Sequence, residues 1–179
     1  MPTLSNFLRW TIFHTRRKDG SVLVSDVCKK CNMTREELLK NVKNDTKGRF
    51  QIIEEYIGEY RIEYIRACQG HGRHLTIDLG LLMKEVTNIH DLHSLIVHGT
   101  SKNLYNVISN EGLSPRDRQC IHFGQGLNPK SGMRKRCTMF IILNVEQSLR
   151  DNIPLYISYN GVVCCPTDIP PKYLVFILL

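Results

Sequence analysis

Arginine and histidine side chains recur in three short segments of the chain, two of which also contain a glycine. Residues 66–71 read Arg-Ala-Cys-Gln-Gly-His, residues 98–100 read His-Gly-Thr, and residues 118–122 read Arg-Gln-Cys-Ile-His. A guanidinium keeps its charge and binds phosphate oxygens in pairs, and a glycine lets the backbone approach a ligand closely. These segments therefore favour a site for a phosphorylated ligand.

Two further segments add polar groups of the same kind. Residues 158–162 read Ser-Tyr-Asn-Gly-Val, and residues 132–134 read Gly-Met-Arg within a loop rich in glycine, proline and basic residues. The sequence lacks the glycine-rich loops of P-loop and Rossmann proteins and the serine elbow of α/β-hydrolases. A nucleotide ligand would therefore not be bound as a hydride carrier.

Taken in this order, the motifs resemble those of the RNA 2′-phosphotransferases, from Leu4-Ser5 to Pro171-Lys172-Tyr173. The resemblance implies an enzyme that removes the splice-junction 2′-phosphate from tRNA, as the last step of tRNA splicing. The phosphate is transferred to NAD, and the products are ADP-ribose 1″,2″-cyclic phosphate and nicotinamide. NAD is then a consumed co-substrate, and no metal is implied.

The resemblance also implies roles for individual residues. The catalytic positions are His14, Arg66 and Arg118. Arginine forks suit this chemistry because they hold an anionic nucleophile and stabilise charge on a crowded phosphate. The positions implied for NAD binding are His98, Gly99, Thr100, His122, Arg134, Ser158, Asn160 and Gly161. Those implied for RNA binding are Lys47, Arg49, Gln69 and His71.

The chain departs from the family pattern at position 13. Phe13 stands where the family has an arginine just before His14. A phenyl ring cannot bind phosphate, so one residue of the implied phosphate site is missing. If the first helix runs through this position, Arg9 and Arg16 lie one turn to either side and could substitute. The alternative is that Phe13 belongs to the hydrophobic core.

Three functions therefore stay open. The favoured one is the complete 2′-phosphotransferase. The second is a catalytically impaired relative that binds NAD and RNA, because of Phe13. The third is an RNA ADP-ribosyltransferase that stops at the ADP-ribosylated intermediate.

The first part of the chain predicts three helices and a β-hairpin. Leu4, Phe7, Leu8 and Ile12 have helical spacing, and Ser25 is placed to cap a helix over 26–32. Thr34-Arg35-Glu36-Glu37 is a capping box for the third helix. We expect a short strand over 22–24 and the hairpin strands over 49–53 and 61–67, with Gly58 in the turn. This order is typical of a winged helix.

The part from Ser94 onward predicts short strands separated by polar turns. A helix over 102–110 is expected to stop at Gly112. The expected strands cover 95–97, 120–123, 137–145, 155–158, 162–164 and 173–179. We therefore predict an α+β protein with an RNA-binding winged-helix lobe (1–75), a connection (76–93) and a β-rich, ADP-ribosyltransferase-like lobe (94–179) that binds NAD.

The composition of the chain indicates which binding partner and which cellular compartment to expect. The 179 residues carry a net charge of +7, which favours a polyanionic partner such as RNA. The seven cysteines are scattered and no export signal is visible, so we expect reduced thiols in the cytoplasm or nucleus. Cys28 and Cys31 lack a second pair at zinc-finger spacing. No apolar run approaches the ~20 residues of a membrane span, and we expect a monomer.

Overall fold

The chain is a mixed α/β protein that divides between Leu82 and Met83 into two units. The computed structural model describes residues 3–93, 95–133 and 136–179. The division falls within the stretch expected as a connection, 76–93. That stretch is itself folded: it contains helix α4 (Leu79–Leu82), strand β4 (Lys84–Glu85) and the short 3-10 helix η1 (Ile89–Asp91).

The first unit begins with the helices α1 (Leu4–Trp10), α2 (Val24–Cys31) and α3 (Arg35–Lys43). The predicted capping box of α3 is confirmed, since Thr34 Oγ1 accepts from Glu37 N and Glu37 Oε2 accepts from Thr34 N. These two bonds satisfy backbone donors that the first turn of a helix leaves open.

Two predictions for these helices are wrong. The first helix ends at Trp10 rather than continuing past Ile12, so Phe13 and His14 lie in the segment that follows it. Ser25 is not a cap, because α2 begins one residue earlier at Val24, directly after strand β1. Both errors concern helix ends, where local spacing carries little information.

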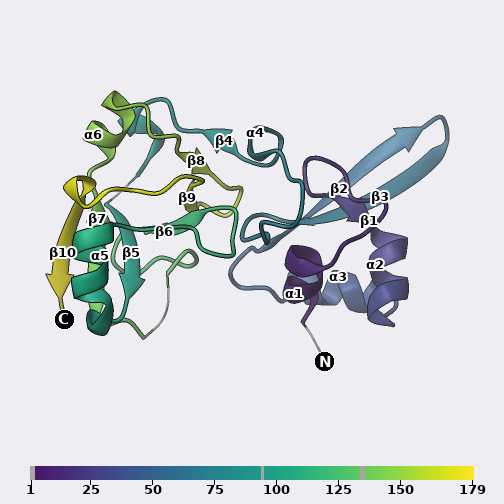
Figure 1. Cartoon of the computed structure of the whole chain (residues 1–179). Coiled ribbons are helices and arrows are strands. Elements are labelled where there is room, and N and C mark those ends of the chain that lie inside the picture. Colours follow the sequence, from purple (N-terminus) through teal and green to yellow (C-terminus); the bar gives the residue numbers. More distant parts are fainter. Residues whose placement is uncertain (1–2, 94, 134–135) are drawn as a thin grey trace. The chain divides into compact units, whose positions relative to one another are not determined.

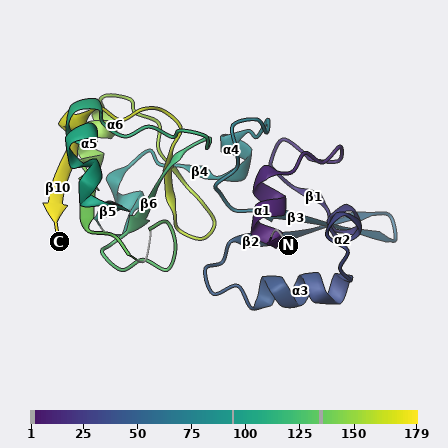
Figure 2. The same ribbon diagram turned by 60° about the horizontal axis from the view of Figure 1, so that its bottom comes forward.

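A three-stranded antiparallel sheet completes the first unit, in the order β1-β3-β2. Its strands are β1 (Val22–Leu23), β2 (Phe50–Ile57) and β3 (Tyr60–Ala67). Figures 1 and 2 both show the helices gathered at one end of the hairpin β2–β3, while its tip extends beyond them. The register places Gln51 opposite Arg66, so both side chains lie on the same face of the hairpin.

Apolar side chains from all of these elements form the core of the first unit. The helices contribute Leu8, Val27 and Leu38, and β3 contributes Ile65. Phe13 belongs to the same cluster and is 9% exposed. The structure therefore supports the alternative stated for position 13, that Phe13 belongs to the hydrophobic core.

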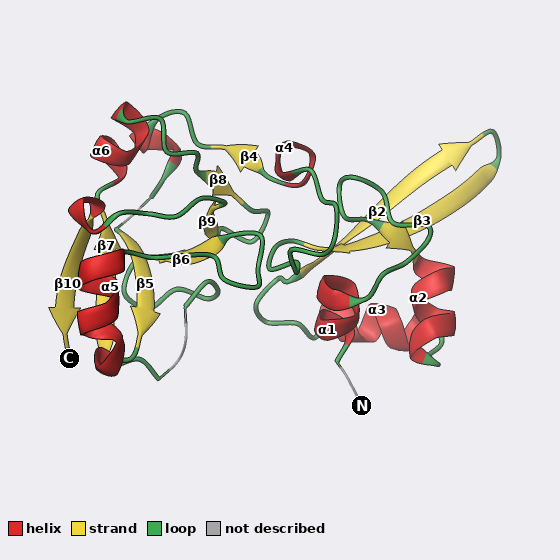
Figure 3. Cartoon of the chain, in the orientation of Figure 1, coloured by secondary structure: helices red, strands yellow, loops and turns green. Residues whose placement is uncertain are grey.

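The second unit is built on a seven-stranded sheet of antiparallel pairs in the order β10-β7-β5-β6-β9-β8-β4. Besides β4, its strands are β5 (Ile96–Thr100), β6 (Ile121–Gln125), β7 (Met139–Leu143), β8 (Tyr156–Ile157), β9 (Val163–Cys165) and β10 (Leu174–Leu178). Strand β6 pairs with β9 through residues 121–123 and with β5 through Gly124 and Gln125. This change of partner in mid-strand joins the two halves of the sheet (Figure 3).

Two longer helices accompany this sheet. Helix α5 (Tyr105–Glu111) follows the 3-10 helix η2 (Lys102–Leu104) and ends at Gly112, as the sequence predicts. Helix α6 (Val145–Arg150) is a correction, because the strand expected over 137–145 stops at Leu143. Asn144 caps α6 by accepting from Gln147 N. Another 3-10 helix, η3 (Pro171–Tyr173), precedes β10.

The core of the second unit lies around Phe123, Met139, Ile141, Leu155 and Ile169. Cys164 and Cys165 form no disulfide bond in the described structure and are fully buried in β9, as expected for cysteines that pack as small apolar residues. Across the described ranges, no helix is both long enough and apolar enough to cross a lipid bilayer.

Candidate functional site

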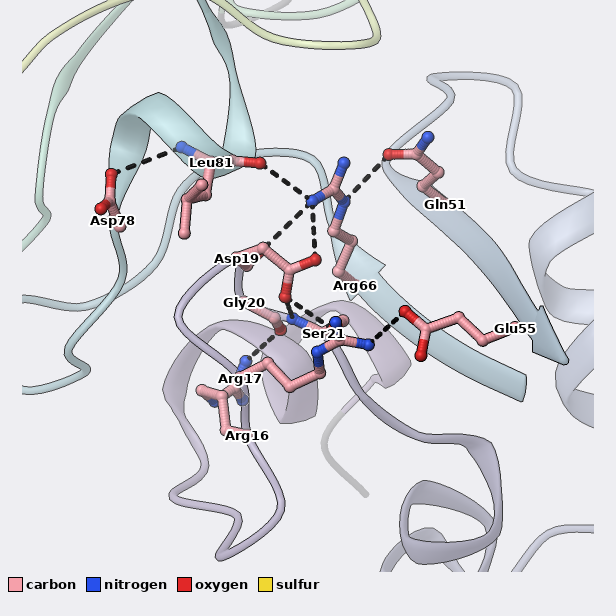
Figure 4. Close-up of polar contacts among 10 residues, drawn as sticks. All are labelled: Arg16, Arg17, Asp19, Gly20, Ser21, Gln51, Glu55, Arg66, Asp78 and Leu81. Atoms are coloured by element: carbon pink, nitrogen blue, oxygen red, sulfur yellow. Dashed lines mark hydrogen bonds and ion pairs between the residues drawn. The ribbon is translucent and has the colours of Figure 1, made fainter. Parts of the chain in front are cut away.

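Arg66 is the best-defined candidate residue of the first unit. Its Nε donates to Gln51 Oε1 on the neighbouring strand at 2.9 Å, and its Nη1 donates to Asp19 Oδ2 at 3.1 Å. Nη1 also lies 3.3 Å from the backbone carbonyls of Asp19 and Leu81 (Figure 4). Arg66 therefore forms an ion pair with Asp19, as is usual for a partly buried arginine.

Asp19 binds Arg66 from the turn that precedes β1. Its Oδ1 accepts from the backbone N and the Oγ of Ser21, at 3.0 and 2.6 Å. Burial raises the pKa of Asp19, but the hydrogen bonds from Ser21 and the charges of Arg66 and Arg17 outweigh it and leave that pKa below its usual value. The carboxylate is thus ionised near neutral pH.

Arg16, one of the two arginines that could substitute at position 13, binds the protein's own backbone. Its guanidinium donates to three backbone carbonyls, those of Gly20, Leu8 and Thr11, at 2.8 to 3.0 Å. It also lies 5.5 Å from the ring centroid of Phe13, and burial lowers its pKa to about 10. Arg16 therefore fastens the end of α1 to the turn that contains Asp19.

The other candidates of the first unit differ in exposure. His14 is exposed in the turn after α1, whereas Gln69 and His71 are buried. Arg9 lies against this motif, since a Cβ added to Gly70 would be 3.2 Å from Arg9 Nε. Burial, followed by the charges of Arg16, Arg9 and Arg66, lowers the pKa of His71 to about 3. His71 is therefore a neutral imidazole near neutral pH.

Lys47 and Arg49 lie in the approach to β2 and are both partly buried. Arg49 is bound by a carboxylate, because its Nε donates to Asp45 Oδ1 at 2.7 Å and its backbone N donates to Asp45 Oδ2. An RNA phosphate at Arg49 would therefore share the guanidinium with Asp45.

In the second unit, His98 and His122 lie on the neighbouring strands β5 and β6. His98 Nδ1 is 2.9 Å from the backbone carbonyl of His122. Since a carbonyl only accepts, Nδ1 carries the proton in this contact and the ring orientation is fixed. The ring of His98 also meets Phe123 edge to face at a centroid distance of 5.8 Å. Gly99 and Thr100 follow on β5 and are buried.

The loop between β6 and β7 lies over this part of the sheet. A Cβ added to Gly99 would be 2.5 Å from Met133 Cγ, and one added to Gly124 would be 2.3 Å from Pro129 Cγ. The space that Gly99 leaves open beside its backbone is therefore occupied by the protein's own loop. Arg134, the residue that follows Met133, lies outside the described residues.

The turn between β8 and β9 holds the remaining candidates together. Ser158 Oγ donates to Asn160 Oδ1 at 2.8 Å, and Asn160 Nδ2 donates to Ser131 Oγ in the loop at 3.2 Å. Gly161 has φ +77°, so the tight turn needs a glycine. Its carbonyl accepts from Gln125 Nε2 at 3.0 Å. Through Ser131 and Met133, the loop over 126–133 joins this turn to β5.

Arg118 belongs to the second unit and is exposed in a turn before β6, where its backbone N donates to Pro115 O at 3.2 Å. His14 and Arg66 belong to the first unit. Within the second unit, by contrast, the contacts described above connect six of the NAD candidates: His98, Gly99, His122, Ser158, Asn160 and Gly161.

The sequence did not indicate four residues that support these candidates: Asp19, Gln51, Gln125 and Ser131. Gln51 could have been found, because pairing the two predicted hairpin strands about Gly58 places it opposite Arg66. Asp19 is 47 positions from Arg66, and no local pattern signals that contact. Among the described residues, no group of three or more His, Cys, Asp or Glu side chains could hold a metal ion.

Three relatives illustrate which proteins this chain resembles in sequence. A Schizosaccharomyces pombe protein provisionally named a tRNA 2′-phosphotransferase is 37% identical over 156 residues, which is 82% of this chain and 40% of that protein. The tRNA 2′-phosphotransferase 1 of Bos taurus is 36% identical over 117 residues, 61% of this chain and 45% of that protein. A Burkholderia pseudomallei protein provisionally named an RNA 2′-phosphotransferase is 29% identical over 146 residues, 80% of this chain and 71% of that protein.

The chain thus spans less than half the length of the first two relatives. Residues 4–167 match the sequence pattern described as "RNA 2'-phosphotransferase, Tpt1 / KptA family". That match includes Arg66, Arg118 and both of the motifs joined by the loop over 126–133. Because it covers nearly the whole chain, this protein belongs to the RNA 2′-phosphotransferase family.

Proposed function

We propose that this chain is an NAD-dependent 2′-phosphotransferase that acts on the splice-junction 2′-phosphate of tRNA. The phosphate leaves the RNA ribose and ends on ADP-ribose as a 1″,2″-cyclic phosphate, and nicotinamide departs. The match of residues 4–167 to the family carries this proposal.

In this proposal, His14, Arg66 and Arg118 contact the 2′-phosphate. A phosphate that gains charge during transfer needs donors whose positions are fixed beforehand. Arg66 meets this demand, because Gln51 and Asp19 hold two of its three nitrogens. Phe13 lies in the core, so the phosphate site contains no side chain from position 13.

NAD would be bound by the second unit, through His98, Gly99, Thr100, His122, Arg134, Ser158, Asn160 and Gly161. The donor set fits a dinucleotide, since it combines imidazole, hydroxyl and amide groups with backbone that Gly161 leaves uncovered. A Cβ at Gly161 would meet nothing closer than Gln125 Nε2 at 3.6 Å, which leaves room for a ligand atom there. When bound, NAD supplies the ribosyl group that accepts the phosphate.

RNA would be bound by the first unit, for which we propose a winged-helix fold, with an ADP-ribosyltransferase-like fold for the second. Lys47 and Arg49 are the stronger candidates for RNA contacts, because Gln69 and His71 are buried. The seven cysteines, none of which forms a disulfide bond in the described structure, support a cytoplasmic or nuclear site of action. We further propose that the protein acts as a monomer.

The direct test is to incubate the whole chain with NAD and an oligonucleotide that carries one internal 2′-phosphate. The expected products are nicotinamide, ADP-ribose cyclic phosphate and an oligonucleotide with a 2′-hydroxyl. The same oligonucleotide without the phosphate is the control and should release no nicotinamide. Absence of nicotinamide with the phosphorylated strand at stoichiometric enzyme would refute the proposal.

The placement of Phe13 in the core favours one alternative, the catalytically impaired relative. Specific binding of the 2′-phosphorylated strand without turnover would select it. Accumulation of ADP-ribosylated RNA in the same assay would instead select an enzyme that stops at the intermediate.

A further inference from the structure

The guanidinium of Arg66 is fixed at two of its three nitrogens, by groups from two different parts of the first unit. Gln51 Oε1 accepts from Nε across the hairpin, and Asp19 Oδ2 accepts from Nη1 from the turn before β1. A guanidinium is planar and rigid, so two fixed nitrogens also determine where the third one lies. Figure 4 shows this third nitrogen, Nη2, directed away from Asp19.

Asp19 is suited to this task because it uses both of its carboxylate oxygens. Oδ1 accepts twice from Ser21, and Oδ2 accepts from Arg66. An asparagine has one carbonyl oxygen and could satisfy Ser21 or Arg66 but not both. The contact with Arg66 therefore depends on the carboxylate and not only on the shape of the side chain.

The turn that carries Asp19 is itself fastened on several sides. Gly20 N donates to Arg17 O at 3.0 Å, and Arg17 N donates to Ser21 O at 2.8 Å, so the turn closes on itself. The side chain of Arg16 ties it to the end of α1. The side chain of Arg17 ties it to the hairpin, through Glu55 on β2 and the ring of Tyr64 on β3. Asp19 is thus held before it holds Arg66.

We propose that Asp19 and Gln51 are positioning residues for phosphate transfer, which hold the Arg66 guanidinium so that Nη2 faces the 2′-phosphate. This inference rests on the proposed function, because it assigns the phosphate of that reaction to Arg66. Asp19 and Gln51 act through Arg66 and do not touch the substrate. The competing explanation is an ordinary ion pair that stabilises the fold and has no effect on the reaction.

Steady-state nicotinamide release from NAD and the 2′-phosphorylated oligonucleotide separates the two explanations. Asp19→Asn is expected to lower kcat/KM for the oligonucleotide by roughly 10- to 100-fold, since small displacements of a catalytic group are costly. Gln51→Leu is expected to act in the same direction but more weakly, because Asp19 still holds the guanidinium. The KM for NAD should stay within about twofold of the parent in both variants, because NAD is assigned to the second unit.

The decisive measurement is the double variant. If Asp19 acts through Arg66, Asp19→Asn should change kcat/KM by less than about twofold in a protein that already carries Arg66→Ala. Glu63→Gln is the matched control, because Glu63 lies on the same strand and binds Arg35 and Arg61 instead. The control should keep the activity of the parent. Melting temperatures verify that each variant is folded, and if Asp19→Asn does not fold, Gln51→Leu carries the same cycle.

Three results overturn the inference. The first is an active parent in which Asp19→Asn behaves like Glu63→Gln. The second is a cycle in which the costs of Asp19→Asn and Arg66→Ala simply multiply, as expected for a structural role. The third is an active parent that Arg66→Ala leaves unchanged, which removes the arginine from the site but not the function. A parent without any turnover refutes the proposed function itself, and the inference falls with it.

Discussion

The two units orient their candidate residues by different means. In the first unit, the carboxylate of Asp19 holds Arg66 and that of Asp45 holds Arg49. In the second unit, a backbone carbonyl orients His98, and the hydroxyl groups of Ser158 and Ser131 orient Asn160. The first unit thus relies on full charges, whereas the second relies on neutral dipoles and on close packing against glycines.

This difference corresponds to the ligands proposed for each unit. A phosphate is met best by a cation whose orientation is fixed and whose charge is only partly compensated. A dinucleotide presents sugars, rings and a pyrophosphate, and neutral donors and acceptors suit most of that surface. Changes of charge should therefore affect the first unit most, and changes of shape the second.

The largest effect is expected from placing a charge in the core of the first unit. Phe13→Arg removes a buried ring and buries a guanidinium, so we expect a loss of about 3–5 kcal/mol in the free energy of unfolding. Urea denaturation measures it. Ile12→Arg is the control, because Ile12 is 69% exposed and should tolerate arginine. A stable Phe13→Arg protein with faster turnover would show that position 13 belongs to the phosphate site.

The next effect concerns the reaction in the first unit. Arg66→Lys keeps the charge but loses the planar fork, so we expect a fall in kcat of about 10²- to 10³-fold, or about 2.7–4 kcal/mol. Nicotinamide release measures it, with Arg35→Lys as the control because Arg35 pairs with Glu63 on the exposed surface. Equal rates for Arg66→Lys and the parent would remove Arg66 from the catalytic residues.

A change of shape without charge probes the second unit. Gly99→Ala places a Cβ 2.5 Å from Met133 Cγ, so the loop over 126–133 must shift. We expect a loss of about 1–3 kcal/mol in unfolding free energy, together with weaker NAD binding, measured by calorimetry. Gly80→Ala is the control, since its Cβ would meet only Asp78 Oδ1 at 3.4 Å. Unchanged NAD affinity in Gly99→Ala would separate this loop from the NAD site.

The last prediction concerns His71, a neutral side chain of the first unit, and its effect grows as the pH falls. Its pKa is about 3 in the folded protein, lowered by burial and then by Arg16, Arg9 and Arg66, against about 6.5 in an unfolded chain. Below pH 6.5 the unfolded chain binds a proton that the folded protein does not, so protonation favours the unfolded state. His71 therefore leaves the free energy of unfolding undiminished above pH 6.5. As the pH falls below 6.5, the free energy of unfolding decreases by up to about 1.4 kcal/mol per pH unit.

The measurement is the pH dependence of unfolding free energy between about pH 6.5 and 4. Replacing His71 by glutamine should make that dependence shallower than in the parent. Identical slopes for the parent and the His71 variant would show that His71 is not kept neutral by its surroundings.

Local patterns in the sequence predicted the parts that local bonds determine. The capping box at Thr34, the helix stop at Gly112 and the hairpin about Gly58 are all encoded within a few residues. The apolar run 137–145 concealed the start of α6, because a capping Asn144 is a weaker signal than a continuous apolar stretch. For the candidate site, the motif residues were found through resemblance. The groups that hold Arg66 were not, since Asp19 contacts it only after the chain has folded.

The hairpin register limits how this protein can change in length over evolution. Gln51 and Arg66 face each other, and Ile57 and Tyr60 close the ladder at the tip. Because neighbouring side chains on a strand point to opposite faces, one extra residue in a single strand would turn one member of the Gln51–Arg66 pair away from the other. One residue added to each strand near the tip would leave that pair intact. Hairpins in functional relatives should therefore lengthen or shorten by matched pairs, with unmatched insertions confined to the turn at Gly58.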